Sequence, residues 1–177
     1  MLNSRNKKYI LVMASFLMGV LILMSIPFLR DQWQMRTLKS TALTDLSIMN
    51  IRPGQTAGSV DFSQFKPSPD FEDRTQHGLQ YKYFEDFMVA LDSRGTIVKL
   101  QTLSDKGLRS FGDGTTTDMA QVEKRWGTDF VVRGYDREQG LTARIYDDKQ
   151  NRLKAEFVYP ENGELDGKLV FLILEKY

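Results

Sequence analysis

Cysteine is absent from this 177-residue chain, and histidine occurs once, as His77. Without cysteine there is no disulfide, no thiol nucleophile and no cysteine-ligated metal site. His77 stands in a stretch rich in proline and charge, with no G-x-S-x-G motif beside it, so nothing indicates histidine-dependent catalysis. A zinc site made from this histidine and carboxylates alone would be an unusual ligand set. We therefore predict that the chain is not an enzyme and holds no metal and no cofactor.

A large excess of either charge is also missing. The 24 Lys and Arg residues nearly balance the 23 Asp and Glu residues. Three of the cations precede residue 9, so from Arg30 onward 21 cations face all 23 acids. Such a balance gives no long-range attraction to nucleic acid or to an anionic membrane surface. We predict no nucleic-acid partner.

One long apolar run stands out. Residues 9–29 carry no charge, and a helix over them would span about 31 Å, close to the thickness of a bilayer's hydrocarbon core. Because basic residues precede the run, the pattern predicts a cytoplasmic tail at 1–8, a transmembrane anchor at 9–29 and a juxtamembrane stalk at 30–50. It predicts a single-pass cell-membrane protein whose C-terminal domain is extracytoplasmic. A cleaved signal peptide stays open as the alternative, although the run exceeds the usual length of its apolar region.

The rest of the chain, residues 51–177, is predicted to be one α+β domain. It contains two similar units, at about 51–105 and 111–176, each with a glycine, a threonine-containing helix start, an aromatic residue and a Gly-Leu pair that opens a strand. We expect an N-terminal transmembrane helix followed by this duplicated unit of a helix and three antiparallel strands, forming one sheet with helices on one face. The better helix has Thr116 or Thr117 as its cap and Gly127 as its stop. Alternating apolar residues predict strands at 79–83, 87–91, 97–103, 141–146, 153–159 and 169–174.

The repeated motif carries a resemblance to a known family. It consists of Gly54-Gln55-Thr56 with Val60, and of Gly114-Thr115-Thr116 with Val122, Trp126 and Gly127. With these residues, positions 48–176 resemble the β-lactamase-inhibitor-protein-like (BLIP-like) fold of the SmpA/OmlA envelope lipoproteins. The chain departs from the pattern in having no lipobox cysteine and a degenerate first helix. Residues 135–158 are also similar to a PepSY domain.

The resemblance implies a non-enzymatic, membrane-anchored module of the bacterial cell envelope that binds another envelope protein. The alternative that it leaves open is a regulator or inhibitor of an envelope protease or sensor kinase. Less favoured is an envelope hydrolase that works with carboxylates, because neighbouring acids on a strand point to opposite faces. The acidic loop 160–167 offers four oxygen ligands without EF-hand spacing, so calcium binding there stays open.

Tyrosine is the residue type that we select for a partner-binding surface. It combines a large apolar ring with a polar tip and is enriched in protein interfaces. If an open sheet face binds the partner, we expect the contacts to come from Tyr81, Tyr83, Tyr146 and Tyr159. Ordinary packing between neighbouring strands is the alternative role for these side chains.

Overall fold

The computed structural model describes residue 18 and residues 32–109, 118–161 and 167–177. The chain divides into two compact units, Met1–Thr37 and Leu38–Tyr177. In the first unit residues 32–37 are helical, and the Thr37 hydroxyl donates to the carbonyl of Trp33 at 3.0 Å. All the strands found in the described residues belong to the second unit.

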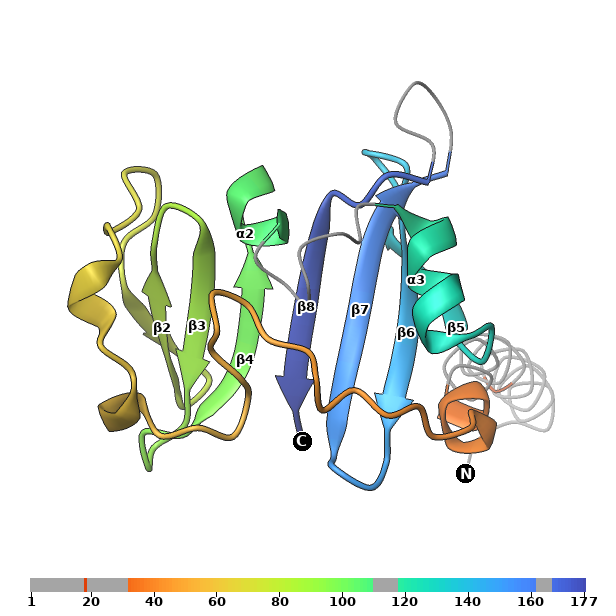
Figure 1. Cartoon of the computed structure of the whole chain (residues 1–177), viewed down its shortest axis with the longest axis horizontal. Coiled ribbons are helices and arrows are strands. Elements are labelled where there is room, and N and C mark those ends of the chain that lie inside the picture. The colour runs from red at the N-terminus through yellow and green to blue at the C-terminus, as the bar shows by residue number, and fades with distance from the viewer. Residues whose placement is uncertain (1–17, 19–31, 110–117, 162–166) are drawn as a thin grey trace, which may run out of the picture. The chain divides into compact units, whose positions relative to one another are not determined.

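The second unit is built on one antiparallel sheet (Figure 1). Its strands are β1 (Arg74–Gln76), β2 (Leu79–Tyr83), β3 (Phe87–Leu91), β4 (Ile97–Thr102), β5 (Val131–Asp136), β6 (Leu141–Asp148), β7 (Leu153–Pro160) and β8 (Phe171–Lys176). Their spatial order is β1-β2-β3-β4-β8-β7-β6-β5. Two four-strand meanders are therefore joined where β4 pairs with β8, and β1 and β5 form the two free edges.

Helices are few and short among the described residues of this unit. They are the 3₁₀ turns η1 (Ala57–Ser59) and η2 (Phe62–Gln64) and the α-helices α2 (Asp105–Arg109) and α3 (Met119–Trp126). Asp118 caps α3, because its side chain accepts a hydrogen bond from the Gln121 amide. Gly127 ends the helix with a φ of 83°. The predicted second helix is thus confirmed, but its cap is Asp118 in place of the predicted Thr116 or Thr117, which lie outside the described residues.

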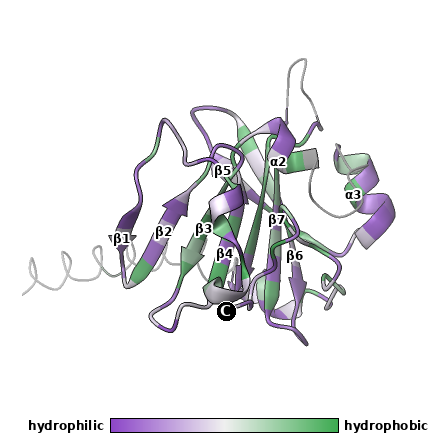
Figure 2. Cartoon of the chain, turned by 60° about the vertical axis from the view of Figure 1, so that its left-hand side comes forward, coloured by the Kyte–Doolittle hydropathy of each residue, from purple (hydrophilic) through white to green (hydrophobic). Residues whose placement is uncertain are grey.

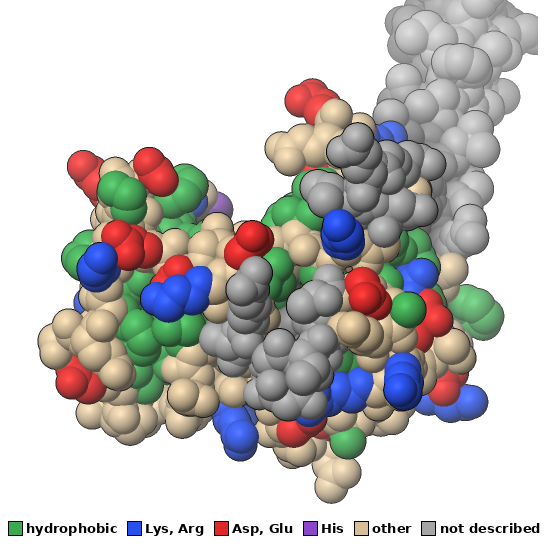
Figure 3. All heavy atoms as spheres, turned by 45° about the horizontal axis from the view of Figure 1, so that its top comes forward, with side chains coloured by type: hydrophobic (Ala, Val, Ile, Leu, Met, Phe, Trp, Pro, Cys, Tyr) green, Lys and Arg blue, Asp and Glu red, His purple; other side chains and the backbone are tan. Residues whose placement is uncertain are grey.

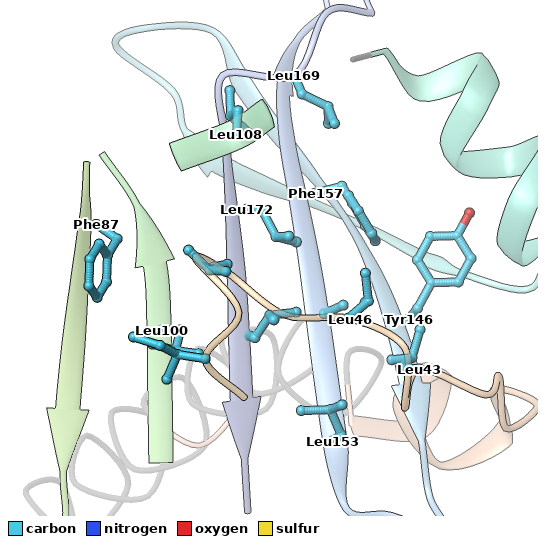
Figure 4. Close-up of a cluster of buried hydrophobic side chains, with 14 of the residues drawn as sticks. Leu43, Leu46, Phe87, Leu100, Leu108, Tyr146, Leu153, Phe157, Leu169 and Leu172 are labelled. Atoms are coloured by element: carbon cyan, nitrogen blue, oxygen red, sulfur yellow. The ribbon is translucent and has the colours of Figure 1, made fainter. Parts of the chain in front are cut away.

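The main core lies on one face of the sheet, which we call the inner face. Alternate residues of the central strands point to it, and α3 and the chain segment 38–65, which we call the strap, lie over it (Figure 1). The strap contributes Leu43, Leu46 and Ile48, each at most 1% exposed, to the same cluster as Tyr146 and Phe157 (Figure 4). The opposite, outer face carries a smaller cluster around Tyr83, Met88 and Ala90.

A tight turn inside the strap folds it onto the sheet. Met49 and Asn50 both have positive φ values, 54° and 62°, as a type I′ turn requires. Ile48 and Ile51, on either side of the turn, exchange backbone hydrogen bonds of 3.0 and 2.9 Å. Both isoleucine side chains are consequently buried in the core.

Asp148, at the end of β6, fastens the strap to the sheet. Its carboxylate is 2% exposed and accepts hydrogen bonds from the Leu43 amide at 3.0 Å and from the Asn151 amide and side chain at 3.0 and 2.9 Å. Burial raises the pKa of Asp148, but the hydrogen bonds outweigh it and hold the pKa below its ordinary value.

This clamp predicts a loss of stability in acid. Because the folded-state pKa of Asp148 is lowered, its contribution is present above the unfolded-state pKa near 3.9 and disappears as the pH falls through the lower folded-state value. At pH 7 we expect Asp148→Asn to lower the free energy of unfolding by about 1–3 kcal/mol. Urea unfolding of both proteins between pH 7 and pH 3 measures this. The difference in the free energy of unfolding between the two proteins should narrow below about pH 4. A difference that is constant with pH would contradict the proposed ionic clamp.

The observed sheet differs from the predicted fold class and corrects it. In place of two units with one helix and three strands each, the second unit is a single eight-stranded antiparallel sheet with little helix. The first predicted helix is replaced by η1 and η2, in a stretch that Gly58 and Pro67 make unfavourable for an α-helix. The added strands, β1 and β5, lie at the free edges, where residues need no apolar alternation. Figure 2 shows β1 hydrophilic along its length, in contrast to β3.

The membrane prediction is also corrected. Within the part of the chain that the structure describes, no helix is long and apolar enough to cross a membrane. A span needs about 20 apolar residues, whereas the whole of α3 is 8 residues long, polar residues included. This finding contradicts the transmembrane segment, the single-pass topology and the cell-membrane localisation. Apart from Met18, the predicted anchor at 9–29 lies outside the described residues.

The start of the compact sheet-containing unit differs from the predicted domain start. That unit begins at Leu38, within the stretch assigned to a stalk at 30–50, rather than at residue 51. Residues 38–50 are not helical, and Leu43, Leu46 and Ile48 are buried in the core. The spacing of Leu38, Ala42 and Leu46 suited a helical stalk, yet they lie in an irregular segment with turns.

Candidate functional site

An aromatic cluster lies on the outer face of β2. Tyr81 and Tyr83 alternate with Gln80 and Lys82, so both tyrosines point away from the main core. Tyr83 pairs with Met88 across the strands, and Tyr81 pairs with Ala90. These residues form the separate apolar cluster of the outer face, with Tyr83 9% exposed and Tyr81 half-buried.

Two residues from neighbouring segments complete this cluster. The ring of Phe71 stacks on Tyr83 with centroids 5.4 Å apart and is itself 54% exposed. The guanidinium of Arg74, on β1, lies 5.9 Å from the centroid of Tyr81 and 5.7 Å from that of Tyr83. Both distances are within cation–π range. We call Phe71, Arg74, Tyr81 and Tyr83 the aromatic patch.

Backbone hydrogen bonds fix the loop that carries Phe71. The Asp73 carboxylate accepts from the Tyr83 amide at 2.9 Å, and the Ser68 amide donates to the Tyr83 carbonyl at 3.0 Å. The loop is thus tied to β2 on both sides of Phe71. The aromatic patch is preorganised, which reduces the entropy lost when a partner binds.

The other two predicted tyrosines lie on the inner face. Tyr146 is fully buried, its hydroxyl donates to the Gly127 carbonyl at 2.8 Å, and burial raises its pKa to about 12. The hydroxyl of Tyr159, 6% exposed, accepts a hydrogen bond from Arg144 Nε at 3.2 Å. Both belong to the main core cluster. The structure therefore brings Tyr81 and Tyr83 together and separates them from Tyr146 and Tyr159, which have packing roles.

Phe71 and Arg74 are the members of the patch that the sequence analysis missed. Neither belongs to an alternating pattern, because Phe71 is in a loop and β1 is only three residues long. The available signal was Phe71 itself, an isolated aromatic residue in the polar stretch Pro67–Gly78. An aromatic side chain outside any alternating pattern is a candidate for a surface contact.

His77 and the paired acids are the candidates for metal or acid–base chemistry. Among the described residues, no group of three His, Asp or Glu side chains is arranged to hold a metal ion. His77 occupies the turn between β1 and β2, with a φ of 51°, and is exposed. Asp147 and Asp148 point to different partners, the Tyr177 hydroxyl and the Leu43 amide, as expected for adjacent residues of a strand. In the acidic loop 160–167, residues 162–166 lie outside the described part of the chain.

Comparisons were made with models of protein families, with curated proteins and with solved structures. None of the three found a match for this chain.

Proposed function

We propose that this chain is a non-enzymatic module that binds another protein through the aromatic patch on the outer face of β1 and β2. The observation that carries the proposal is the exposed Phe71 ring stacked on Tyr83 beside Arg74. Phe71 is 54% exposed, so covering its ring removes apolar surface from water and favours binding. Its neighbours are already ordered around it, which lowers the entropy lost on binding.

The residue types of the patch suit a protein partner. Tyrosine and arginine are enriched among the residues that dominate binding energy at protein interfaces, and the planar rings offer large area with few rotatable bonds. Arg74 adds a charge and several hydrogen-bond donors at the rim of the apolar surface. A partner with an apolar side chain flanked by a carboxylate or backbone carbonyls would complement the patch.

The free edge beside the patch supports the same proposal. β1 pairs only with β2, and all three of its residues are exposed. Its outer backbone groups are available for an added strand, a common mode of peptide recognition. A partner segment lying along β1 would bring its side chains to Phe71 and Tyr81.

Site-specific crosslinking in cells of the source organism tests the proposal. A photoreactive residue replaces Thr75 on β1 in the otherwise unchanged chain, and in the Phe71→Ala/Tyr81→Ala double variant. We expect one reproducible crosslinked protein with the first and at least a tenfold lower yield with the second, because two central contacts are lost. The crosslinked product is identified and quantified by mass spectrometry.

Tyr135→Ala is the matched control for this experiment. Tyr135 is 43% exposed and packs against Phe171 at 5.0 Å, so it resembles the Phe71–Tyr83 pair but lies on β5, at the opposite free edge. Its crosslinking yield should equal that of the unchanged chain. Equal yields from all three proteins, or no specific product from the unchanged chain, would contradict the proposed surface.

A further inference from the structure

A pocket of about 310 Å³ opens at one end of the first meander, away from the aromatic patch residues. It is formed by three segments that are distant in sequence: the strap, the β2–β3 turn and the start of α2. Its lining comprises Met49, Gln64, Phe65, Lys66, Phe84, Glu85, Asp86, Phe87 and Lys106. The volume is at the lower end of the range for small-molecule sites.

Aromatic rings provide its apolar wall. Phe65 meets Phe87 edge to face with centroids 4.9 Å apart, and Phe84 stacks on Phe87 at 4.8 Å. Phe62 also stacks on Phe84, with centroids 5.5 Å apart, and supports it. Phe87 is fully buried and Phe84 is 8% exposed, so these rings form a rigid base. The half-buried Phe65 and Met49 supply the apolar lining that a ligand can reach, which favours a flat, apolar group.

Charges of both signs stand beside these rings. Lys106 Nζ lies 2.7 Å from an oxygen of Asp86, and Lys66 Nζ lies 3.8 Å from an oxygen of Glu85. The carboxylates come from the turn, Lys106 comes from α2, and Lys66 directly follows the strap. Figure 3 shows basic and acidic side chains next to one another beside hydrophobic surface on the left of that face.

The carboxylate of Asp86 is held in place, whereas the lysines extend into solvent. Asp86 also accepts from the Ser104 hydroxyl at 2.7 Å, and its side chain is 16% exposed. Partial burial raises the pKa of Asp86, but hydrogen bonds from Lys106 and Ser104 outweigh it, so the group is ionised at neutral pH. The side chains of Lys66 and Lys106 are 81% and 73% exposed, which leaves their ammonium groups able to move toward a ligand.

The backbone makes the approach of α2 to the turn unusually close. A Cβ atom added at Gly107 would lie 2.1 Å from the Asp86 carbonyl oxygen, which no side chain could tolerate without a shift. The Gly107 amide donates to Ser104 Oγ at 3.1 Å, and the Leu103 amide donates to that same Asp86 carbonyl at 2.9 Å. Glycine at this position therefore permits the close approach of α2 to the turn that carries Asp86.

We propose that this pocket binds a free aromatic amino acid in its zwitterionic form. The ring of the ligand packs against the phenylalanine wall, its ammonium group pairs with the carboxylates of Glu85 and Asp86, and its carboxylate pairs with Lys66 and Lys106. Binding exchanges ion pairs within the protein for ion pairs with the ligand, so no charge is left unpaired.

The charge pattern discriminates against the related ligand classes. A cation without a carboxylate leaves both lysines unpaired and close to its own positive charge. An anion without an ammonium group leaves both protein carboxylates unpaired and close to its own negative charge. An uncharged aromatic molecule covers the rings but uses none of the charged groups. The amino acid is the ligand whose charges match both sets.

Nuclear magnetic resonance titration of the full chain tests the proposal with three probes. L-phenylalanine is the zwitterion, phenethylamine has only the ammonium group and hydrocinnamate has only the carboxylate. We expect saturable shifts of the Phe84–Phe87 amides with L-phenylalanine at millimolar concentration or below, and at least tenfold weaker binding of the other two. Equal binding of all three, or no saturation with L-phenylalanine by about 10 mM, would overturn the proposal.

Lys106→Met keeps the apolar stem of the side chain and removes its charge. Because Lys106 is exposed, the fold should persist, which an unchanged amide spectrum away from the pocket verifies. L-phenylalanine should then bind about tenfold more weakly, while phenethylamine should bind no worse. Lys124→Met, on the exposed side of α3, is the matched control and should leave all three affinities unchanged. An unaltered affinity of Lys106→Met for L-phenylalanine would also overturn the proposal.

Discussion

Trp126→Ala is expected to lower the free energy of unfolding by about 3–5 kcal/mol, the cost of removing a large aromatic side chain from a well-packed core. Trp126 is the last residue of α3 and is 8% exposed. Its ring lies 5.2 Å from that of Phe157, which in turn meets Tyr146 edge to face at 5.6 Å. Trp126 therefore connects α3, the longest helix among the described residues, to the centre of the sheet.

Trp33→Ala is the matched control, because the chain contains only two tryptophans. Trp33 is 66% exposed and belongs to the first compact unit, so its removal should change stability by less than about 0.5 kcal/mol. Urea unfolding followed by circular dichroism compares both variants with the unchanged chain. If Trp126→Ala unfolds at the same urea concentration as the control, α3 does not pack on β7 as described.

The interior of the fold was predictable because its strands are buried and regular. All five residues of β3 are apolar and all are buried, so the continuous apolar run and the packing agree. β6 and β7 were likewise predicted as strands, although their ends extend beyond the predicted limits. Where the burial of apolar side chains decides the conformation, the sequence predicts the strand.

The edges and the strap were not predictable by the same reasoning. β1 consists of Arg74-Thr75-Gln76, all exposed, and it exists because the turn at His77-Gly78 folds it back onto β2. In the strap, Leu43, Leu46 and Ile48 are buried by long-range contacts with the sheet rather than by a repeating local structure. Apolar spacing in a non-regular segment does not show which surface will cover it.

The candidate surface was half predictable for a related reason. Alternation along β2 puts Tyr81 and Tyr83 on one face, and this much follows from the sequence. Which face of each strand receives the strap and α3 depends on the pairing of β4 with β8, which no local pattern reveals. Tyr146 and Tyr159 were grouped with Tyr81 and Tyr83 by residue type alone, and the register of the sheet separates them.

Removing residues 1–50 is expected to abolish cooperative folding, whereas removing residues 1–37 should preserve it. The shorter deletion leaves the compact unit Leu38–Tyr177 whole. The longer one removes Leu43, Leu46 and Ile48, each at most 1% exposed. Loss of one buried leucine or isoleucine costs about 2–5 kcal/mol, so three losses approach the whole stability of a typical domain, about 5–15 kcal/mol.

The longer deletion also leaves polar groups of the sheet without partners. The Asp148 carboxylate loses the Leu43 amide, and the Asp147 carbonyl loses the Thr41 amide that donates to it at 2.9 Å. Scanning calorimetry of chains 38–177 and 51–177 distinguishes the two deletions, since only the first should give a sharp unfolding transition. The chain 38–177 carrying Leu43→Ala should fall between them, destabilised by about 2–5 kcal/mol but still cooperative. A sharp transition at the same temperature in 51–177 would show that the strap covers a core that is already stable, and the sheet-containing domain would then begin at residue 51 after all.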